Sequence, residues 1–142
     1  MSDLVSYINQ SKYNEKIAKF LLNSTNYLDW SITVAFYSAI HFVNAGFCFD
    51  GIDLDNLKTN NNESVHALRQ NKVHSEYGVD CYKSYRRLRM ASNKVRYLEH
   101  YQGIDEIPSL SYFDKNDVID FIEKDLECIK VEVLKKSKFN NN

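Results

Sequence analysis

Glycine, proline and cysteine are all scarce in this chain. Its 142 residues include four glycines and one proline, which is too few for a turn-rich β-sandwich or a disordered chain. The cysteines, Cys48, Cys81 and Cys128, are odd in number and widely spaced, with no CxxC pair. This pattern argues against a disulfide framework or a zinc site and favours free thiols in a reducing cytosol.

Long apolar runs are also missing, and with them the sequence signs of a membrane protein. The first residues, Met1 to Leu4, lack the basic and apolar regions of a signal peptide. The longest apolar stretch, Val34 to Phe49, is interrupted by polar residues and is shorter than a membrane span requires. We therefore expect a cytoplasmic protein without membrane contact, in which this stretch forms a buried helix.

Helical periodicity fills the long blocks between the glycines. In the first block, the apolar residues that share one side are Leu4, Ile8, Ile17, Phe20 and Leu21. The second block, capped by Asn26 or Asp29, is apolar nearly all round, which predicts a central helix packed on several sides. The aromatic residues that we expect in its core are Trp30, Phe36, Phe42 and Phe47.

The remaining blocks complete an all-α fold. A loop is expected over 50–63, then a helix that Ser64 caps and Gly78 interrupts before it ends near Tyr97. After a second loop over 103–111, Asp114 caps a last amphipathic helix. We predict an antiparallel bundle of four to five helices, with a single domain over residues 1–138 and a frayed tail over residues 139–142.

Positive charge is concentrated in one window of a chain whose net charge is −1. No acid occurs between Cys81 and Leu98, and the cations there are Lys83, Arg86, Arg87, Arg89, Lys94 and Arg96. The forked N–H donors of an arginine guanidinium match the oxygens of a phosphate. Interleaved tyrosines such as Tyr97 offer ring faces on which a base can stack. The alternative is a solvated helix face whose cations pair with acids on neighbouring helices.

Signatures of metal and nucleotide chemistry are lacking. The sequence contains no HExxH, GxGxxG, Walker or GxSxG motif and no clustered metal-ligating acids. We therefore predict neither a metal nor a cofactor. Of the histidines, His41 lies in the most apolar block and is expected to be a hydrogen-bonded core residue.

Histidine and arginine remain as the candidates for chemistry. His66 and Arg69 share a helix face, as do Arg96 and His100, whereas Arg69 and His74 converge only if the helix bends or a second subunit supplies one of them. Such pairs can cleave RNA without a metal, because an imidazole takes the 2′-hydroxyl proton and a guanidinium stabilises the charged phosphorane. A structural or solvated role is the alternative for either pair.

The segment from Asp29 to Ala45, DWSITVAFYSAIHFVNA, resembles the second helix of small bacterial HEPN-domain proteins. The later run His66-x2-Arg69-x3-Val73, Tyr85-x2-Leu88 and Ser92 with Arg96-Tyr97 resembles the same family, so that the likeness covers about half of the chain. HEPN domains are helical bundles that usually dimerise. Many are metal-independent ribonucleases of toxin–antitoxin or phage-defence systems, and others are non-catalytic binding modules.

The resemblance implies an active site made of an arginine followed by a histidine, with two copies meeting across a dimer. Arg69-x4-His74 has the family's spacing, and Arg96-x3-His100 is one residue shorter. We thus expect catalysis by Arg69 and His74 with His66 and Arg96 beside them. Phosphate contacts would come from Arg86, Arg87, Arg89 and Lys94. The expected partners are RNA, a second copy, and an antitoxin or other defence-system protein; the alternative is a non-catalytic interaction module.

Overall fold

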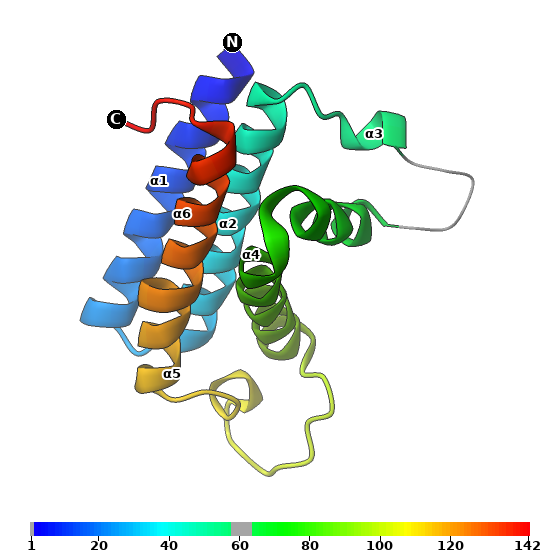
Figure 1. Ribbon diagram of the computed structural model, residues 1–142. Helices are drawn as coiled ribbons and strands as arrows, with labels where there is room; N and C mark the ends of the chain where they lie inside the picture. The colour runs from blue at the N-terminus through cyan, green and yellow to red at the C-terminus, as the bar shows by residue number, and fades with distance from the viewer. Residues whose placement is uncertain (1, 58–63) are drawn as a thin grey trace.

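The computed structural model describes residues 2–57 and 64–142, and all regular structure within them is helical (Figure 1). The elements are α1 (Ser2–Ser24), α2 (Leu28–Phe49), α3 (Leu54–Leu57), α4 (Val65–Tyr97), the 3₁₀ turn η1 (Pro108–Leu110), α5 (Lys115–Asp120), the π-helical segment η2 (Phe121–Leu126) and α6 (Glu127–Ser137). Helices α1, α2 and α6 lie side by side, and α4 packs against α2 and α6. The predicted all-α bundle is confirmed.

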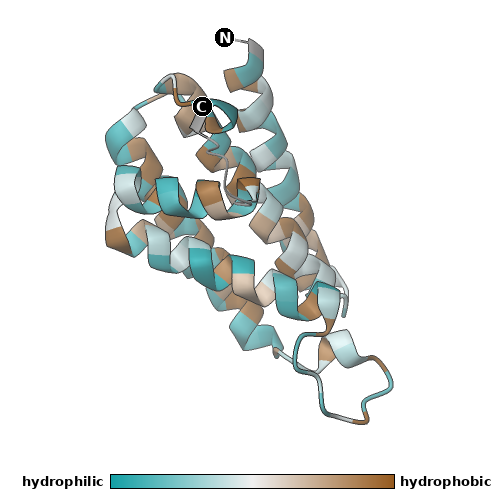
Figure 2. Cartoon of the chain, turned by 90° about the vertical axis from the view of Figure 1, so that its right-hand side faces the viewer, coloured by the Kyte–Doolittle hydropathy of each residue, from teal (hydrophilic) through white to brown (hydrophobic). Residues whose placement is uncertain are grey.

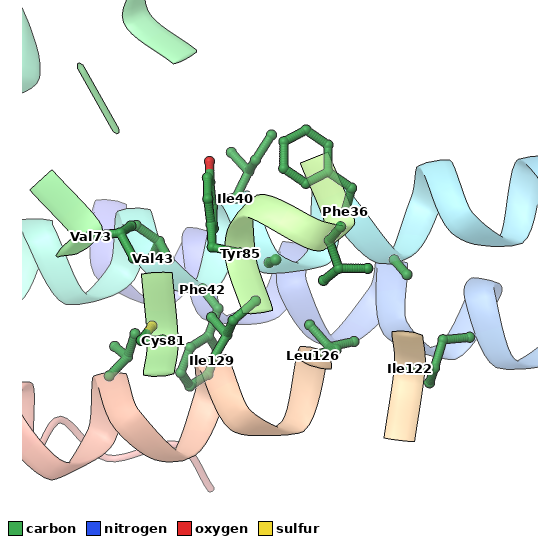
Figure 3. Packing of buried hydrophobic residues seen from close by; sticks show 14 of the residues in the cluster. Phe36, Ile40, Phe42, Val43, Val73, Cys81, Tyr85, Ile122, Leu126 and Ile129 are labelled. Atoms are coloured by element: carbon green, nitrogen blue, oxygen red, sulfur yellow. The ribbon is translucent and has the colours of Figure 1, made fainter. Parts of the chain in front are cut away.

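Helix α2 is the centre of the bundle, because it contacts α1, α4 and α6 at once. Phe36, Phe42 and Phe47 are buried as predicted, and Figure 3 shows the first two within the core. Gly46 allows a close approach of its neighbours, since a Cβ there would collide with the Tyr77 hydroxyl of α4 and with Val133 of α6. The prediction for Trp30 is wrong: its side chain is 58% exposed.

Helix α1 packs on α2 through a face that the sequence predicts only in part. Leu4 and Ile8 are buried, but Phe20 is exposed and the buried positions of that turn are Ala18 and Leu22. Small residues bring the two helices together, because Ser11 and Ser38 each donate a hydrogen bond to the other's backbone oxygen at 2.8 Å. Neither Asn26 nor Asp29 caps α2; its N-cap residue is Tyr27, which makes no side-chain capping bond.

Helix α4 is bent at Gly78, as the sequence predicts. Gly78 has φ 89° and ψ 178°, a conformation that is essentially restricted to glycine. Ser64 caps the helix by accepting a hydrogen bond from the Ala67 N–H. Because of the bend, the two halves of α4 approach each other, and Arg89 Nη1 donates to Gln70 Oε1 at 3.1 Å.

The last helical unit begins at the predicted cap. Asp114 and Asp117 form a capping box, and α5, η2 and α6 follow one another without a break. The inward-facing residues that the structure buries are Val118, Ile122, Leu126, Ile129 and Val133. The tail does not simply fray, since Phe139 is buried and packs on Phe42 and Phe49.

Two further expectations concern the 50–63 loop and the apolar stretch. The loop contains the short helix α3, and its residues 58–63 lie outside the described part of the chain. Helix α2 is long and apolar enough to cross a membrane, but 67% of that apolar window is buried inside the bundle. Burial of this kind is typical of the core helix of a soluble protein.

Candidate functional site

Arg69 joins α4 to α2 at the edge of the core. Its side chain is only 8% exposed. Nε donates to Oδ1 of Asn44 at 3.1 Å, and Nη1 lies 3.4 Å from Nδ1 of His66, one turn earlier on α4. A buried guanidinium is costly without partners, and these neutral partners fix its position without cancelling its charge.

The bend of α4 brings cations from its second half to the same place. Arg89 Nη1 also approaches the backbone oxygen of His66 at 3.5 Å. Arg96 donates to the Tyr37 hydroxyl of α2 at 3.2 Å and to Asn93 Oδ1 at 2.9 Å. We call His66, Arg69, Arg89 and Arg96 the basic cluster.

Figure 2 shows hydrophilic and hydrophobic residues alternating along α4, as a helix with one buried face requires.

The surroundings of His66 and His41 favour the neutral form of both imidazoles. Burial lowers the pKa of His66 below its ordinary 6.5, and the charges of Arg69, Arg89 and Arg96 lower it further. Burial and the charge of Arg69 likewise lower the pKa of His41, whose ring stacks on Tyr7 with the centroids 6.5 Å apart. A neutral imidazole can accept a proton near pH 7, which an imidazolium cannot.

His41 differs from the expected hydrogen-bonded core residue. The side chain is half-buried, and its Nδ1 atom has no hydrogen-bond partner within the described residues. It lies on α2 between Tyr37 and Asn44, which contact Arg96 and Arg69 respectively. His41 therefore borders the basic cluster and leaves an imidazole nitrogen unsatisfied there.

Tyr85 places a second unsatisfied polar group beside the cluster. Its side chain is fully buried, and its hydroxyl makes no hydrogen bond of good geometry to any described residue. Burial raises the pKa of Tyr85 to about 12, although the nearby Arg69 guanidinium opposes the shift. In Figure 3 the oxygen points away from Ile129 and Leu126. A buried hydroxyl without a well-aligned hydrogen bond is one of the exceptions in a core that call for an explanation, and an ordered water or ion beside Arg69 is one such explanation.

Acidic side chains line a hollow on one side of Arg69, but none of the described residues pairs a carboxylate with the arginines of the basic cluster. Among the hydrogen bonds and ion pairs of residues 2–57 and 64–142, none joins Arg69, Arg89 or Arg96 to a carboxylate. A hollow of about 530 Å³ on the α3 side of Arg69 is lined by Asp3, Asp53 and Asp55 among others. These acids would repel an anion, so that the favourable approach to Arg69 is from the side of Arg89 and Arg96.

The structure does not bring the two arginine–histidine pairs of the expected motif together. His74 is exposed and stacks on Tyr82, with the ring centroids 4.6 Å apart, whereas Arg69 contacts Asn44 and His66. His100 lies beyond the end of α4, in a turn where its φ is 56°. Because the helix ends at Tyr97, Arg96 and His100 no longer share a helical face.

The predicted phosphate-binding residues also divide. Arg87 donates through Nη2 and Nε to Oδ1 of the buried Asp125 at 2.7 and 3.0 Å, and is thereby neutralised. Lys94 lies over the ring of Phe113 at 5.9 Å, and Arg86 is exposed. Tyr97 is exposed and stacks on the guanidinium of Arg96, which is 5.0 Å from its ring centre.

Sequence reasoning missed the residues that α2 contributes. Tyr37, His41 and Asn44 are at i, i+4 and i+7, so they form one helical stripe, and each of them borders Arg96 or Arg69. The signal was present in the sequence, since these are polar positions that share one side of a largely apolar helix. Tyr85, by contrast, could not be told from an ordinary core tyrosine.

Comparison with family models, with curated proteins and with solved structures finds no match to this chain. Within the described residues, no three histidine, cysteine, aspartate or glutamate side chains gather closely enough to hold a metal ion.

Proposed function

We propose that the chain binds RNA through the basic cluster and cleaves it without a metal, as a HEPN-type endoribonuclease of a toxin–antitoxin or phage-defence system. The observation that carries the RNA-binding half is the convergence of Arg69, Arg89 and Arg96 around His66 with no carboxylate bound to them in the described residues. The resemblance of the 29–45 segment to HEPN proteins supports the biological setting.

Each member of the cluster has a role in this proposal. The guanidinium groups hold a phosphate, and Arg69 turns from His66 Nδ1 to the phosphate oxygens. The freed Nδ1 of neutral His66 takes the proton of the adjacent 2′-hydroxyl. The 2′ oxygen then attacks phosphorus, the bond to the 5′ oxygen breaks, and that oxygen takes a proton from water. The arginines stabilise the phosphorane, and the products carry a 2′,3′-cyclic phosphate and a 5′-hydroxyl.

Purified protein incubated with total RNA and EDTA tests the proposal. We expect RNA fragments with 2′,3′-cyclic phosphate ends, and a loss of about 100-fold or more in rate for His66→Asn and Arg69→Gln. Arg87→Gln and His74→Asn are matched controls, because their side chains contact Asp125 and Tyr82 instead.

Two results would count against this assignment. Absence of cleavage, or cleavage undiminished in both cluster variants, removes the enzyme. Loss in His74→Asn with full activity in His66→Asn removes His66 as the base and favours the Arg69-x4-His74 spacing acting between two copies.

A non-catalytic interaction module is the second candidate, and α1 supplies the observation that favours it. Val5, Tyr13 and Phe20 are each more than half exposed and fall on one outer face of that helix. Exposed apolar residues that share a face are typical of a protein–protein contact. We infer that this face binds a second copy or a defence-system partner. Sedimentation of Phe20→Lys tests it: a native dimer that becomes a monomer supports the inference, and an unchanged dimer removes α1 from that interface.

A further inference from the structure

Next to the basic cluster, aromatic rings surround one of its arginines. The Arg96 guanidinium carbon lies 5.7 Å from the ring centre of Tyr37 and 5.0 Å from that of Tyr97. Tyr97 is 66% exposed, so one of its faces remains open to solvent. Arg96 thus belongs both to the cationic group around His66 and to an aromatic surface.

A hollow of about 350 Å³ opens beside Arg96. Its lining includes Trp30, Arg96 and Leu98, with Asp29 and Ser109 at one side. Ligand sites span roughly 300 to 1,000 Å³, so this hollow suits one small ring system. Trp30 is 58% exposed beside it, although tryptophan is a residue that folding usually buries. Tyr97 does not line the hollow but adjoins it through its contact with Arg96. We call Trp30, Arg96 and Tyr97 the stacking ledge.

We propose that the stacking ledge binds an unpaired nucleobase of single-stranded RNA whose phosphate lies on the basic cluster. The inference rests on the RNA-binding half of the proposed function and adds the substrate class. Aromatic rings and arginine planes stack on the face of any base, and this face is accessible only where the strand is unpaired. The ledge and the cluster share Arg96, so that one nucleotide can occupy both.

The charge at the hollow favours a base over a second phosphate. Asp29 lines the hollow, and its carboxylate already accepts hydrogen bonds from Ser109 Oγ at 2.7 Å and from the backbone N–H of Trp30 at 2.9 Å. An ionised carboxylate repels phosphate but accepts hydrogen bonds from the N–H groups on a base edge. The phosphate is thereby directed to the arginines and the base to the ledge.

Trp30 is the only tryptophan of the chain, so its fluorescence reports directly on the ledge. The probe is a short 2′-O-methyl oligoribonucleotide, which lacks the 2′-hydroxyl and remains intact. We expect it to quench Trp30 when single-stranded. The same strand annealed to its complement, or one made of abasic units, should leave the fluorescence unchanged at equal concentration.

Substitutions separate the ledge from the rest of the proposal. Trp30→Leu and Tyr97→Leu should each weaken binding of the single strand by about 10-fold, whereas Val131→Ala, at an exposed position of α6, should not change it. If Arg89→Gln weakens oligonucleotide binding but Trp30→Leu and Tyr97→Leu leave the affinity unchanged, the nucleobase proposal is wrong and RNA binding at the basic cluster is retained. Unchanged affinity in Arg89→Gln as well removes the proposed function itself.

A protein partner at the ledge is the competing outcome. If Trp30→Leu dissociates a dimer in sedimentation while the oligonucleotide affinity of each subunit stays the same, the surface is an interface between copies and the nucleobase proposal is wrong. Quenching by the abasic strand equal to that by the normal strand has the same consequence, because a base is then not what contacts Trp30.

Discussion

Arg87 and Arg89 are two positions apart on α4 and have opposite environments. Arg87 faces α6 and η2, where it donates twice to the buried carboxylate of Asp125. Arg89 faces the first half of its own helix, where it donates to Gln70 and to a backbone oxygen. The two arginines of one cationic window thus differ in role. Arg87 forms a structural ion pair, whereas Arg89 carries a positive charge that contacts no carboxylate of the described residues.

The same contrast extends over the two sides of α4. On the α6 side, Glu76 pairs with Lys136 of α6. On the α2 side, Arg69 and Arg96 are held by Asn44 and Tyr37, whose side chains are neutral. The number of cations in a helix therefore does not identify a binding surface. What identifies it is whether the neighbouring helix offers a carboxylate or a neutral acceptor.

The largest effect is expected where the α2 side loses its central guanidinium. Arg69→Lys keeps a positive charge but loses the planar fork, and we expect the rate of RNA cleavage to fall about 100-fold, close to the effect of Arg69→Gln. Cleavage assays of both variants, with chemical denaturation as a check of folding, measure it. Full activity in Arg69→Lys would show that charge alone suffices there.

A change at the bend should affect both the stability and the binding surface. Gly78→Ala forces a side chain into a backbone conformation that alanine avoids, and we expect a loss of about 2 kcal/mol in the free energy of unfolding together with weaker RNA binding. The added Cβ meets no atom within 4 Å, so the loss comes from the backbone and not from a clash.

Gly51→Ala is the matched control for the bend, since Gly51 also has a positive φ, of 72°, and an open space for a Cβ. It should lose some stability and keep its RNA affinity. Equal RNA affinity in Gly78→Ala and the native chain would separate the bend from the basic cluster.

On the α6 side, Asp125→Asn should lower stability by about 1–2 kcal/mol without a change in RNA affinity. The amide removes the charge that holds Arg87 and Ser84, but Arg87 is half in solvent, which limits the loss. Urea unfolding of Asp125→Asn, Arg87→Gln and the double variant gives the coupling between them. Additive losses would show that the pair contributes nothing as a pair.

The two arginines themselves give the most direct comparison. Arg89→Gln should weaken RNA binding several-fold and reduce the slope of log affinity against log salt by about 1. Arg87→Gln should leave that slope as it is, because its charge is already neutralised by Asp125. Titrations at several salt concentrations measure both, and equal slopes for the two variants would contradict the distinction.

The smallest effect is expected from pH. The pKa of His41 is lowered in the folded chain, so that the unfolded chain binds the proton more readily. Stability should be fully present above the ordinary value of 6.5 and should decline as the pH falls below it. In His41→Gln this part of the decline should be absent. Unfolding curves between pH 5 and pH 8 test it, and parallel pH profiles in the two proteins would refute it.

Much of the fold could be predicted because its signals are local. Ser64 and Asp114 cap helices with their own side chains, and Gly78 breaks α4 through its own backbone. The exposure of Trp30 and Phe20 could not be predicted, because apolar spacing does not reveal which side of a helix its neighbours leave uncovered. For tertiary contacts of this kind, periodicity gives the faces but not their partners.

The candidate site could be predicted only as a set of residues, not as an arrangement. His66 and Arg69 are one turn apart, so helical geometry alone places them together. Their proximity to Arg89 depends on the angle of the bend, and the separation of His74 depends on its stacking with Tyr82. No local pattern encodes the angle of a bend or the acceptor that Arg87 finds on another helix.

One consequence of the bend at Gly78 concerns how substitutions combine. The 33-residue helix α4 supplies all four residues of the basic cluster. The backbone conformation of Gly78 alone fixes the distance between residues 66 and 69 on one side of the bend and residues 89 and 96 on the other. Changes at these positions are therefore expected to show epistasis with position 78. Once the bend at Gly78 is lost, replacing Arg89 should change RNA affinity little, because its side chain no longer reaches Gln70 and His66.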